Sequence, residues 1–269
     1  MIIKKNHFDL DKFFICFFSI FVIIYLVILC FPIVSVVKYS GISNIISTLQ
    51  NHESLSAIKL SFQTSLTSLL LTFILGTPTV FFIVLNKKHL LAKLVDLIIE
   101  IPITLPPAAA GIALLLAFGK NGLLKNLFSI YNIQLTFTPI AVIIAQFFVS
   151  SIYYIQVLET SLSAVPIEIF EASYVSGCGK VGTAIRVIIP MLKKSIISGL
   201  ILTWIRSMGE FGATIVFAGN VLGKTTTMPL FIYTLMQTNI VKAAAFSLVL
   251  YIISFIILLL IKTWCSNND

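Results

Sequence analysis

Charged residues are scarce in this sequence. Only 10% of its 269 residues are Asp, Glu, Lys or Arg, whereas 58% are hydrophobic. Soluble domains carry about 25% charged residues, so this composition excludes an ordinary globular domain. The four cysteines show no paired spacing, which argues against a disulfide framework and against a metal site. The three histidines are scattered, and no Ser/His/Asp arrangement points to catalysis. These shortages leave an integral membrane protein as the class.

Long apolar runs are what the sequence has in abundance. A bilayer core about 30 Å thick is crossed by about 20 apolar residues in an α-helix. A lipid-exposed backbone must satisfy its own hydrogen bonds, which favours helices. The sequence therefore predicts an all-α integral membrane protein with six transmembrane helices. They are expected at about 13–37, 60–85, 98–118, 139–158, 196–218 and 243–261.

Basic residues outnumber acidic ones by 18 to 10. We interpret this excess as a sign of topology rather than of nucleic-acid binding, because Lys and Arg are enriched in cytoplasmic loops. With the amino terminus inside, the outer segments carry Lys38, Lys59, Lys120, Lys125, Lys224 and Lys242; the inner ones carry Lys4, Lys5, Lys12, Lys87, Lys88, Lys93, Lys180, Arg186, Lys193, Lys194 and Lys262. This bias predicts a multi-pass membrane protein with an even number of crossings. Both termini and the long loop at 159–195 are expected in the cytoplasm.

One polar stretch between the apolar runs has the spacing of a docking loop. Glu171-Ala172-Ser173 is followed after three residues by Gly177, and after nine more by Val187-Ile188-Ile189-Pro190. A short helix is expected over 167–175, ended near Gly177, because glycine readily adopts the left-handed conformation that closes helices. A second is expected over 182–188, stopping at Pro190. From the residues alone, the stretch is either a lever for a cytoplasmic partner or a generic amphipathic loop at the membrane surface.

This spacing resembles the EAA loop of ABC-transporter permeases, which reads Glu-Ala-Ala, three residues, Gly, nine residues and Ile-x-Leu-Pro. Ser173 stands where that loop has its second Ala, and Ile189 where it has Leu. The resemblance implies short cytoplasmic coupling helices that sit in a groove of a separate ATPase. ATP and Mg would be used by that partner, and this chain would be a non-catalytic subunit without a cofactor or metal. The resemblance assigns ATPase coupling to Glu171, Ala172, Ser173, Gly177, Val187 and Pro190.

Two charged residues lie inside the expected fifth span. An Arg at the centre of a membrane helix costs roughly 2.5–3.5 kcal/mol, so such residues are functional candidates. Arg206 and Glu210 are four apart, on one helical face, where they could pair. Gly209 and Gly212 would let a neighbouring helix or a second copy approach closely. In one interpretation these residues line the translocation pathway as part of a gate or anion guide. In the other, Arg206 and Glu210 form a structural ion pair.

Two other spans carry residues suited to close packing or bending. The second span is rich in small hydroxyl residues between Thr64 and Thr72, followed by Gly76. The third is interrupted by Leu105-Pro106-Pro107, where proline disfavours a continuous helix. For both features, a role beside the pathway and a plain structural role stay open.

Several segments resemble molybdate-transport permeases, and sulfate permeases are similar but less so at Phe211 and Ala213-Thr214. The resemblance implies a type I ABC importer transmembrane domain in a prokaryotic cell (inner) membrane, with its permease core at 56–262. Residues 1–55 would hold the cytoplasmic N-terminus, first transmembrane helix and external loop, and 263–269 a cytoplasmic tail. The matching residues are Gly209 to Thr214, Ala218-Gly219-Asn220, Thr225 to Leu230, Ile232-Tyr233, Leu105-Pro106-Pro107, Gly111 and Phe118-Gly119.

The expected function is therefore the membrane-spanning permease subunit of an ATP-driven importer that moves molybdate into the cell. The implied partners are a second copy of the chain, a cytoplasmic ABC ATPase dimer, an external oxyanion-binding protein and the lipid bilayer, without nucleic acid. A sulfate or tungstate permease is the neighbouring alternative. An ion-coupled secondary transporter is the alternative from another class. It would need more intramembrane carboxylates than Glu210 and would leave the 171–190 spacing unexplained.

Overall fold

The computed structural model describes residues 3–266, and no strand occurs among them. Side chains are described from Phe14 to Leu259, apart from 15–16, and for Thr263. The elements are α1 (Ile3–Ser40), α2 (Ile42–Gln50), α3 (His52–Leu85), α4 (Leu90–Thr104), α5 (Pro107–Phe118), α6 (Lys125–Ile130), α7 (Pro139–Ser163), α8 (Ile167–Val175), α9 (Lys180–Thr183), the π-helix η1 (Ala184–Ile188), α10 (Ile189–Met191), α11 (Lys193–Met208), α12 (Gly212–Phe217), α13 (Met228–Thr238) and α14 (Ile240–Ser266). The prediction of an all-α membrane protein is confirmed.

Four helices in the described part of the chain are long and apolar enough to cross a membrane. They are α3 and α7 together with Phe17–Ser40 of α1 and Ile240–Leu259 of α14. A fifth crossing is counted if the bent pair α4 and α5 forms one span. The predicted number of six stays a prediction, because two of the expected spans are not single helices.

Those two spans are broken at different kinds of residue. The third bends by 119° between α4 and α5, at the Leu105–Pro106 step that the sequence marked as an interruption. The fifth was expected to be continuous over 196–218, and this was wrong: α11 ends at Met208 and α12 starts at Gly212. No proline marks this second break, and its cause is described with the site below.

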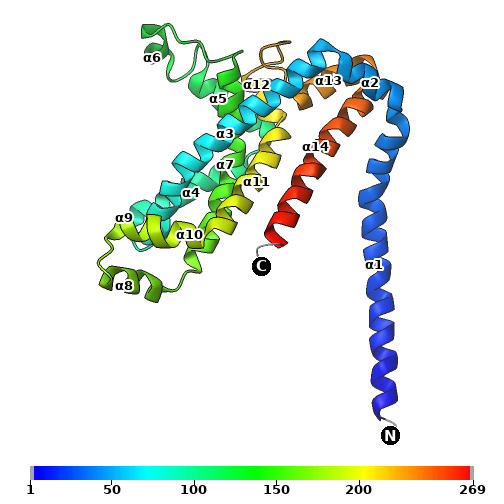
Figure 1. Ribbon diagram of the computed structural model, residues 1–269. Helices are drawn as coiled ribbons and strands as arrows, with labels where there is room; N and C mark the ends of the chain where they lie inside the picture. Colours follow the sequence, from blue (N-terminus) through cyan, green and yellow to red (C-terminus); the bar gives the residue numbers. More distant parts are fainter. Residues whose placement is uncertain (1–2, 267–269) are drawn as a thin grey trace.

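The helices form a bundle with two distinct ends (Figure 1). α3, α7 and α11 pack against one another along its length, α5 packs on α12, and α14 lies beside α13 and α1. α8, α9 and α10 lie at one end, which we call the inner end. α2, α6 and α13 lie at the opposite, outer end. The first turns of α1 and the last turns of α14 are directed toward the inner end.

The small hydroxyl residues of α3 face its neighbours inside the subunit. Thr64, Ser65, Ser68 and Thr72 are each at most 2% exposed. The Ser65 hydroxyl accepts a hydrogen bond from the Trp204 indole of α11 at 2.9 Å. Farther along, a Cβ on Gly76 would lie 3.1 Å from the Tyr154 ring of α7. These contacts favour the packing interpretation of the second span over a lining of the pathway.

Candidate coupling loop and broken helix

The first short helix of the inner loop is α8, with the bounds that the sequence predicted. It ends in a hydrogen-bond pattern typical of helix termini. The N–H of Cys178 donates to the carbonyl of Ser173 at 3.1 Å, and the N–H of Gly177 donates to that of Tyr174 at 3.0 Å. Gly177 has a φ of +83°, in the left-handed region that this ending requires. A Cβ on Gly177 would meet nothing within 4 Å, so backbone conformation alone explains the glycine.

The second short helix differs from its prediction. It begins at Lys180 rather than at residue 182, and it continues past Pro190 to Met191. The turn between its two α-helical pieces is the π-helix η1, in which the N–H of Ile189 donates to the carbonyl of Ala184. Proline lacks an N–H, but Pro190 lies in the first turn of α10, a position where proline is tolerated. The helix therefore passes through Pro190 instead of stopping at it.

A buried hydrogen bond joins the two halves of this loop. The hydroxyl groups of Ser173 in α8 and Thr183 in α9 lie 2.8 Å apart, and both residues are buried. An alanine at position 173 could not make this contact. Ser173, which departs from the Glu-Ala-Ala pattern, thus holds the two helices together.

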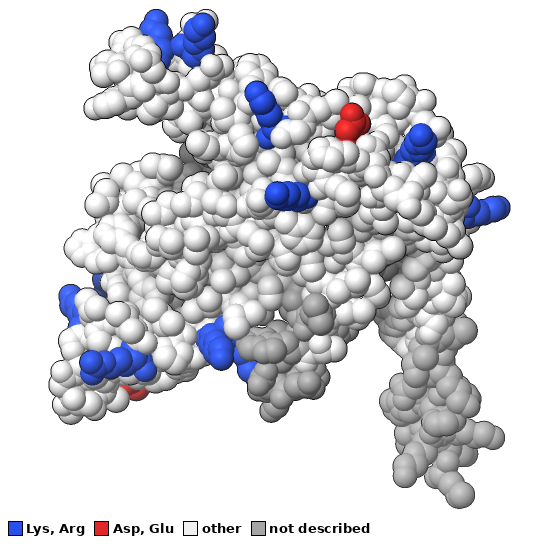
Figure 2. Space-filling view, turned by 45° about the horizontal axis from the view of Figure 1, so that its top comes forward, with Lys and Arg blue, Asp and Glu red and all other residues white. Residues whose placement is uncertain are grey.

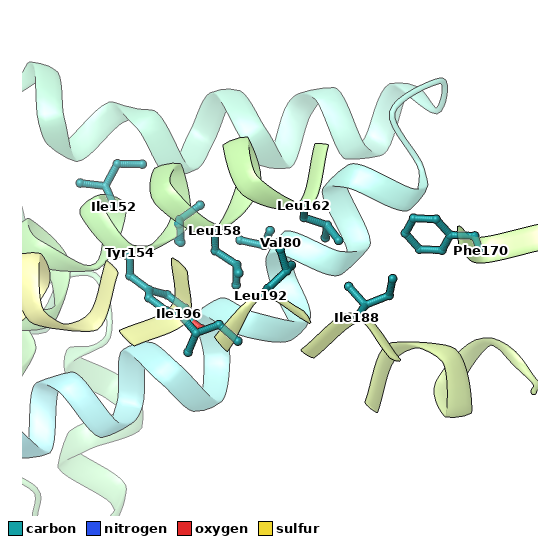
Figure 3. Close-up of a cluster of buried hydrophobic side chains, with 10 residues drawn as sticks. Val80, Ile152, Tyr154, Leu158, Leu162, Phe170, Ile188, Leu192 and Ile196 are labelled. Carbon is teal, nitrogen blue, oxygen red and sulfur yellow. The ribbon is translucent and has the colours of Figure 1, made fainter. Parts of the chain in front are cut away.

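Large apolar side chains fix the loop to the bundle (Figure 3). Phe170 of α8 and Ile188 of η1 belong to the same buried cluster as Leu158, Leu162 and Leu192. Ile188 is fully buried and Phe170 is 8% exposed. Because this cluster also includes Val80 and Ile196, it links the loop to α3, α7 and α11. A displacement of the loop would therefore act directly on all three helices.

The opposite face of the loop is open. Glu171, Ala172 and Pro190 are exposed and Val187 is half-buried. Apolar side chains share this exposure, with Val175 at 90% and Val181 at 72%. Exposed apolar groups beside charged ones are typical of a surface that binds another protein. Of the six residues predicted for coupling, Ser173 and Gly177 shape the loop, Glu171, Ala172 and Pro190 are exposed, and Val187 is half-buried.

The break between α11 and α12 is organised by Glu210. Its carboxylate pairs with the Arg206 guanidinium, with 2.6 Å between Oε2 and Nη1. The other oxygen, Oε1, accepts a hydrogen bond from the N–H of Ala213 at 2.9 Å. The first N–H groups of a helix lack partners within the helix, so Glu210 caps α12 while it pairs with α11. The predicted ion pair is formed, but Glu210 lies outside α11, the helix that carries Arg206.

The two charges differ in their access to solvent. The Glu210 side chain is 1% exposed, whereas the Arg206 side chain is 27% exposed. A second contact steadies the same turn, because the Gln146 amide of α7 donates to the carbonyl of Ser207 at 3.3 Å. The break is therefore a defined joint held by charged and polar groups.

Glycine brings α12 against α5 at this joint. A Cβ on Gly212 would lie 2.6 Å from the Pro107 Cβ, and one on Gly111 would lie 2.7 Å from the Val216 Cβ. The predicted close approach is thus real for Gly212. Gly209 differs, since a Cβ there would meet nothing nearer than 3.7 Å, and the residue is exposed in this chain.

Comparisons with known proteins place the chain in a family. Residues 82–264 match the family described as "Binding-protein-dependent transport system inner membrane component". The chain belongs to this family of transport permeases. It is 57% identical over 246 residues to the "Probable transport system permease protein NifC" of Clostridium pasteurianum, covering 91% of this chain and 86% of that protein.

More distant relatives of the permease are named as molybdenum or sulfate transport permeases. It is 36% identical to the "Molybdenum transport system permease protein ModB" of Mycobacterium tuberculosis, over 77% of this chain and 78% of that one. It is 31% identical to the "Sulfate transport system permease protein CysW" of Synechococcus elongatus, over 76% and 72%. A solved bacterial ABC transporter for alginate shares the fold, with a TM-score of 0.75, 14% identity and coverage of 97% and 98%. The permease is thus a non-catalytic ABC importer subunit of the oxyanion group, close to molybdenum-related permeases.

Sequence reasoning missed a charged group near the inner end of the permease. Asp96 of α4 and Glu159 of α7 line one pocket of about 200 Å³ together with Lys87 and Lys93. The Lys87 ammonium also donates to the Ser163 hydroxyl at 2.8 Å. Acidic and basic residues at the inner ends of two predicted spans were the available signal. Their convergence depends on packing between helices distant in sequence, which spacing along the chain does not reveal.

Proposed function

We propose that this permease carries molybdate into the cell, as one of two identical copies that form a pathway between them. A cytoplasmic ABC ATPase dimer supplies the energy and holds the ATP and Mg. An external binding protein delivers the oxyanion. In this arrangement the inner end and both chain termini are cytoplasmic, in agreement with the excess of basic residues in the inner segments.

The inner loop at 167–191, which we call the coupling loop, carries this proposal. It presents exposed Glu171, Ala172 and Pro190 on one side and buries Phe170 and Ile188 in the bundle on the other. An ATPase that binds the exposed side would move α8 and η1 together, because the Ser173–Thr183 hydrogen bond joins their two halves. The buried side would pass this movement to α3, α7 and α11. Differential binding of the nucleotide states then supplies the bias between inward-open and outward-open forms.

The joint at Arg206 and Glu210 is proposed as part of the gate. Gly209 and Arg206 retain access to solvent, while Glu210 is buried and caps α12. A change in the angle between α11 and α12 would carry α5 with α12, because Gly212 and Gly111 hold these two helices in contact. At this joint, Arg206 is the group that could guide an anion. Glu210 and the glycines hold Arg206 in position.

The test is transport by the reconstituted assembly. The permease and its ATPase are placed in proteoliposomes with the cognate binding protein, and ATP hydrolysis and uptake are measured with molybdate, tungstate and sulfate in turn. We expect molybdate to give the strongest stimulation of both. If sulfate or tungstate stimulates hydrolysis and uptake more strongly, that anion replaces molybdate as the proposed substrate. The likeness to CysW makes sulfate a specific alternative. Undiminished uptake without the ATPase would overturn the coupling and favour an ion-coupled transporter.

A further inference from the structure

A cleft lies at the inner end of the bundle, between the coupling loop and the ends of two long helices. Its volume is about 480 Å³, within the range of about 300–1,000 Å³ that is typical of ligand sites. Three segments that are distant in sequence border it: the end of α3 with the turn that follows, the end of α7, and α8 with the start of α9. We call it the inner cleft.

Two lysines give the inner cleft a positive charge. Lys87 comes from the turn after α3, and Lys180 is the first residue of α9. No Asp or Glu is among the described residues that line the cleft. Figure 2 shows basic side chains over this end of the molecule, at its lower left. The cleft therefore suits an anionic ligand.

A neighbouring pocket accounts for part of this charge. Lys87 also lines the pocket that contains Asp96 and Glu159. Lys93 lies in that pocket as well, so its two acidic side chains share it with two basic ones. Lys180 borders the inner cleft and makes no ion pair with any described residue. The inner cleft thus keeps at least one positive charge that no described carboxylate neutralises.

Hydrogen-bond donors lie beside these charges. The Lys87 ammonium donates to the Ser163 hydroxyl at 2.8 Å, which leaves further N–H groups of Lys87 and the hydroxyl hydrogen of Ser163 for a ligand. Tyr174 of α8 adds a phenol at the border of the cleft and is 43% exposed. Phosphate oxygens accept such hydrogen bonds, and those from an ammonium group to a phosphate are among the stronger ones in proteins.

The remaining wall of the cleft is largely apolar and reaches the lipid-accessible surface of the helices. Leu85 at the end of α3 is 47% exposed, and Ile167 at the start of α8 is 63% exposed. α3 and α7 are candidate membrane spans, and they end at Leu85 and Ser163. Because a span ends near the membrane–water interface, the cleft lies at the level of lipid headgroups. A ligand with a charged head and apolar chains matches this arrangement.

The cleft uses a different side of α8 from the one proposed to bind the ATPase. Ile167, Phe170 and Tyr174 line the cleft, and their spacing of three and four residues places them on one side of the helix. Glu171 and Val175, which are also four apart, lie on a neighbouring side and are exposed. A ligand in the cleft would thus lie between α8 and the bundle.

We propose that the inner cleft binds an anionic glycerophospholipid of the inner leaflet, with its phosphate at Lys87 and Lys180 and its acyl chains over Leu85 and Ile167. Basic pockets between helices at the cytoplasmic side of a membrane suit such headgroups. The bound lipid would connect α8 with the ends of α3 and α7. This inference rests on the proposed function for one point, the assignment of the inner end to the cytoplasm.

The test measures the lipids that the purified assembly of permease and ATPase retains. The assembly is exchanged into detergent with equal amounts of phosphatidylglycerol and phosphatidylcholine, and bound lipid is counted by native mass spectrometry. We expect preferential retention of phosphatidylglycerol. Lys180→Gln should weaken this retention about fivefold and Lys87→Gln/Lys180→Gln about 25-fold, the effect expected of one and two lysines at an anionic lipid surface. Added phosphatidylglycerol should also slow hydrogen exchange of the α8 amides in the unaltered assembly, and less so in Lys180→Gln.

Lys88→Gln is the matched control. It removes the same charge from the turn that carries Lys87, but Lys88 does not line the cleft. The control should change lipid retention by less than about twofold, because an exposed surface charge contributes little.

Four results would overturn the inference. Equal retention of the two lipids would show that the cleft does not select an anionic headgroup. Equal losses in Lys180→Gln and Lys88→Gln would leave only a general attraction of the inner end for anionic lipid. Binding of inorganic phosphate in phosphatidylcholine nanodiscs, lost in Lys180→Gln, would assign the cleft to a free anion. Loss of ATPase from Lys180→Gln with unchanged lipid retention would assign Lys180 to that partner.

None of these measurements involves molybdate or its uptake. The lipid proposal can therefore fail while the proposed function stands, and a failure of molybdate transport would leave the lipid result unchanged.

Discussion

The inner and outer ends of this permease are built by opposite means. At the inner end, the coupling loop is anchored by large buried side chains such as Phe170 and Ile188 in a cluster shared with three long helices. At the outer end, the helices are broken, and α5 meets α12 through Gly111 and Gly212. An ion pair and a helix cap at Glu210 span the break. The inner end is thus held by close apolar packing, whereas the outer end contains a break between helices that polar contacts hold.

This difference indicates where movement is transmitted and where it is converted into opening. Close-packed apolar contacts transmit displacement because they resist deformation. A joint held by a few charged and polar contacts, as at Glu210 and Gln146, can change angle if those contacts change. We therefore expect substitutions that change the backbone shape of the inner loop to affect association with the ATPase. Those at the outer end should affect transport while that association is kept.

The largest effect should come from Glu210→Ala. Removal of one partner of a buried ion pair costs about 3–5 kcal/mol, and the low end is expected because Arg206 keeps some access to water. The same change leaves the N–H of Ala213 without its cap. We expect a lowered midpoint of thermal unfolding in detergent and loss of molybdate uptake, with the ATPase still bound.

Glu210→Gln separates the two roles of this carboxylate. The amide oxygen can still accept from the Ala213 N–H, but the charge that pairs with Arg206 is gone. This variant should be more stable than Glu210→Ala, and the double variant Arg206→Met/Glu210→Gln more stable still if the cost lies in the unpaired guanidinium. Equal stability of Glu210→Ala and the unaltered permease would contradict the joint described here.

The sequence predicted the features that depend on local signals and missed those that depend on contacts between distant residues. The bounds of α8 follow from local signals, since Pro166 precedes it and Gly177 supplies the left-handed ending. The bend between α4 and α5 likewise follows from proline. The break at 209–211 has no such marker: it depends on contacts of Glu210 and Gln146 that only the folded bundle provides. The π-helix at 184–188 and the meeting of Asp96 with Glu159 escaped prediction for the same reason.

Gly212→Ala should have the next largest effect. The added Cβ would overlap the Pro107 Cβ at 2.6 Å, so α12 must move from α5 at a cost of about 1–3 kcal/mol. Gly209→Ala is the matched control, because a Cβ there meets nothing nearer than 3.7 Å in this chain. We expect slower uptake for the first variant alone. Reduced uptake in Gly209→Ala with unchanged stability would instead locate a contact with the second copy or the substrate at that residue.

Gly177→Ala tests the inner loop by its backbone alone. An L-residue in the left-handed region costs about 1–2 kcal/mol, although the space around Gly177 is open. Gly179→Ala is the control, since its surroundings are equally open and its φ is −69°. The first should reduce the amount of ATPase that co-purifies with the permease, and the second should not. Similar losses in both would show that an added methyl group disturbs contact with the ATPase, independently of the left-handed backbone at Gly177.

The smallest effect is expected from Ser173→Ala, which removes the hydrogen bond to Thr183 at a cost of about 0.5–1.5 kcal/mol. Because α8 and η1 each keep an apolar anchor, the ATPase should still bind. ATP hydrolysis should stimulate uptake less, since the two halves of the loop could then move separately. A double-mutant cycle with Thr183→Val isolates the pair, and the two changes together should cost less than their sum. Additive losses in uptake would mean that Ser173 and Thr183 act independently and that apolar packing alone keeps the coupling loop rigid.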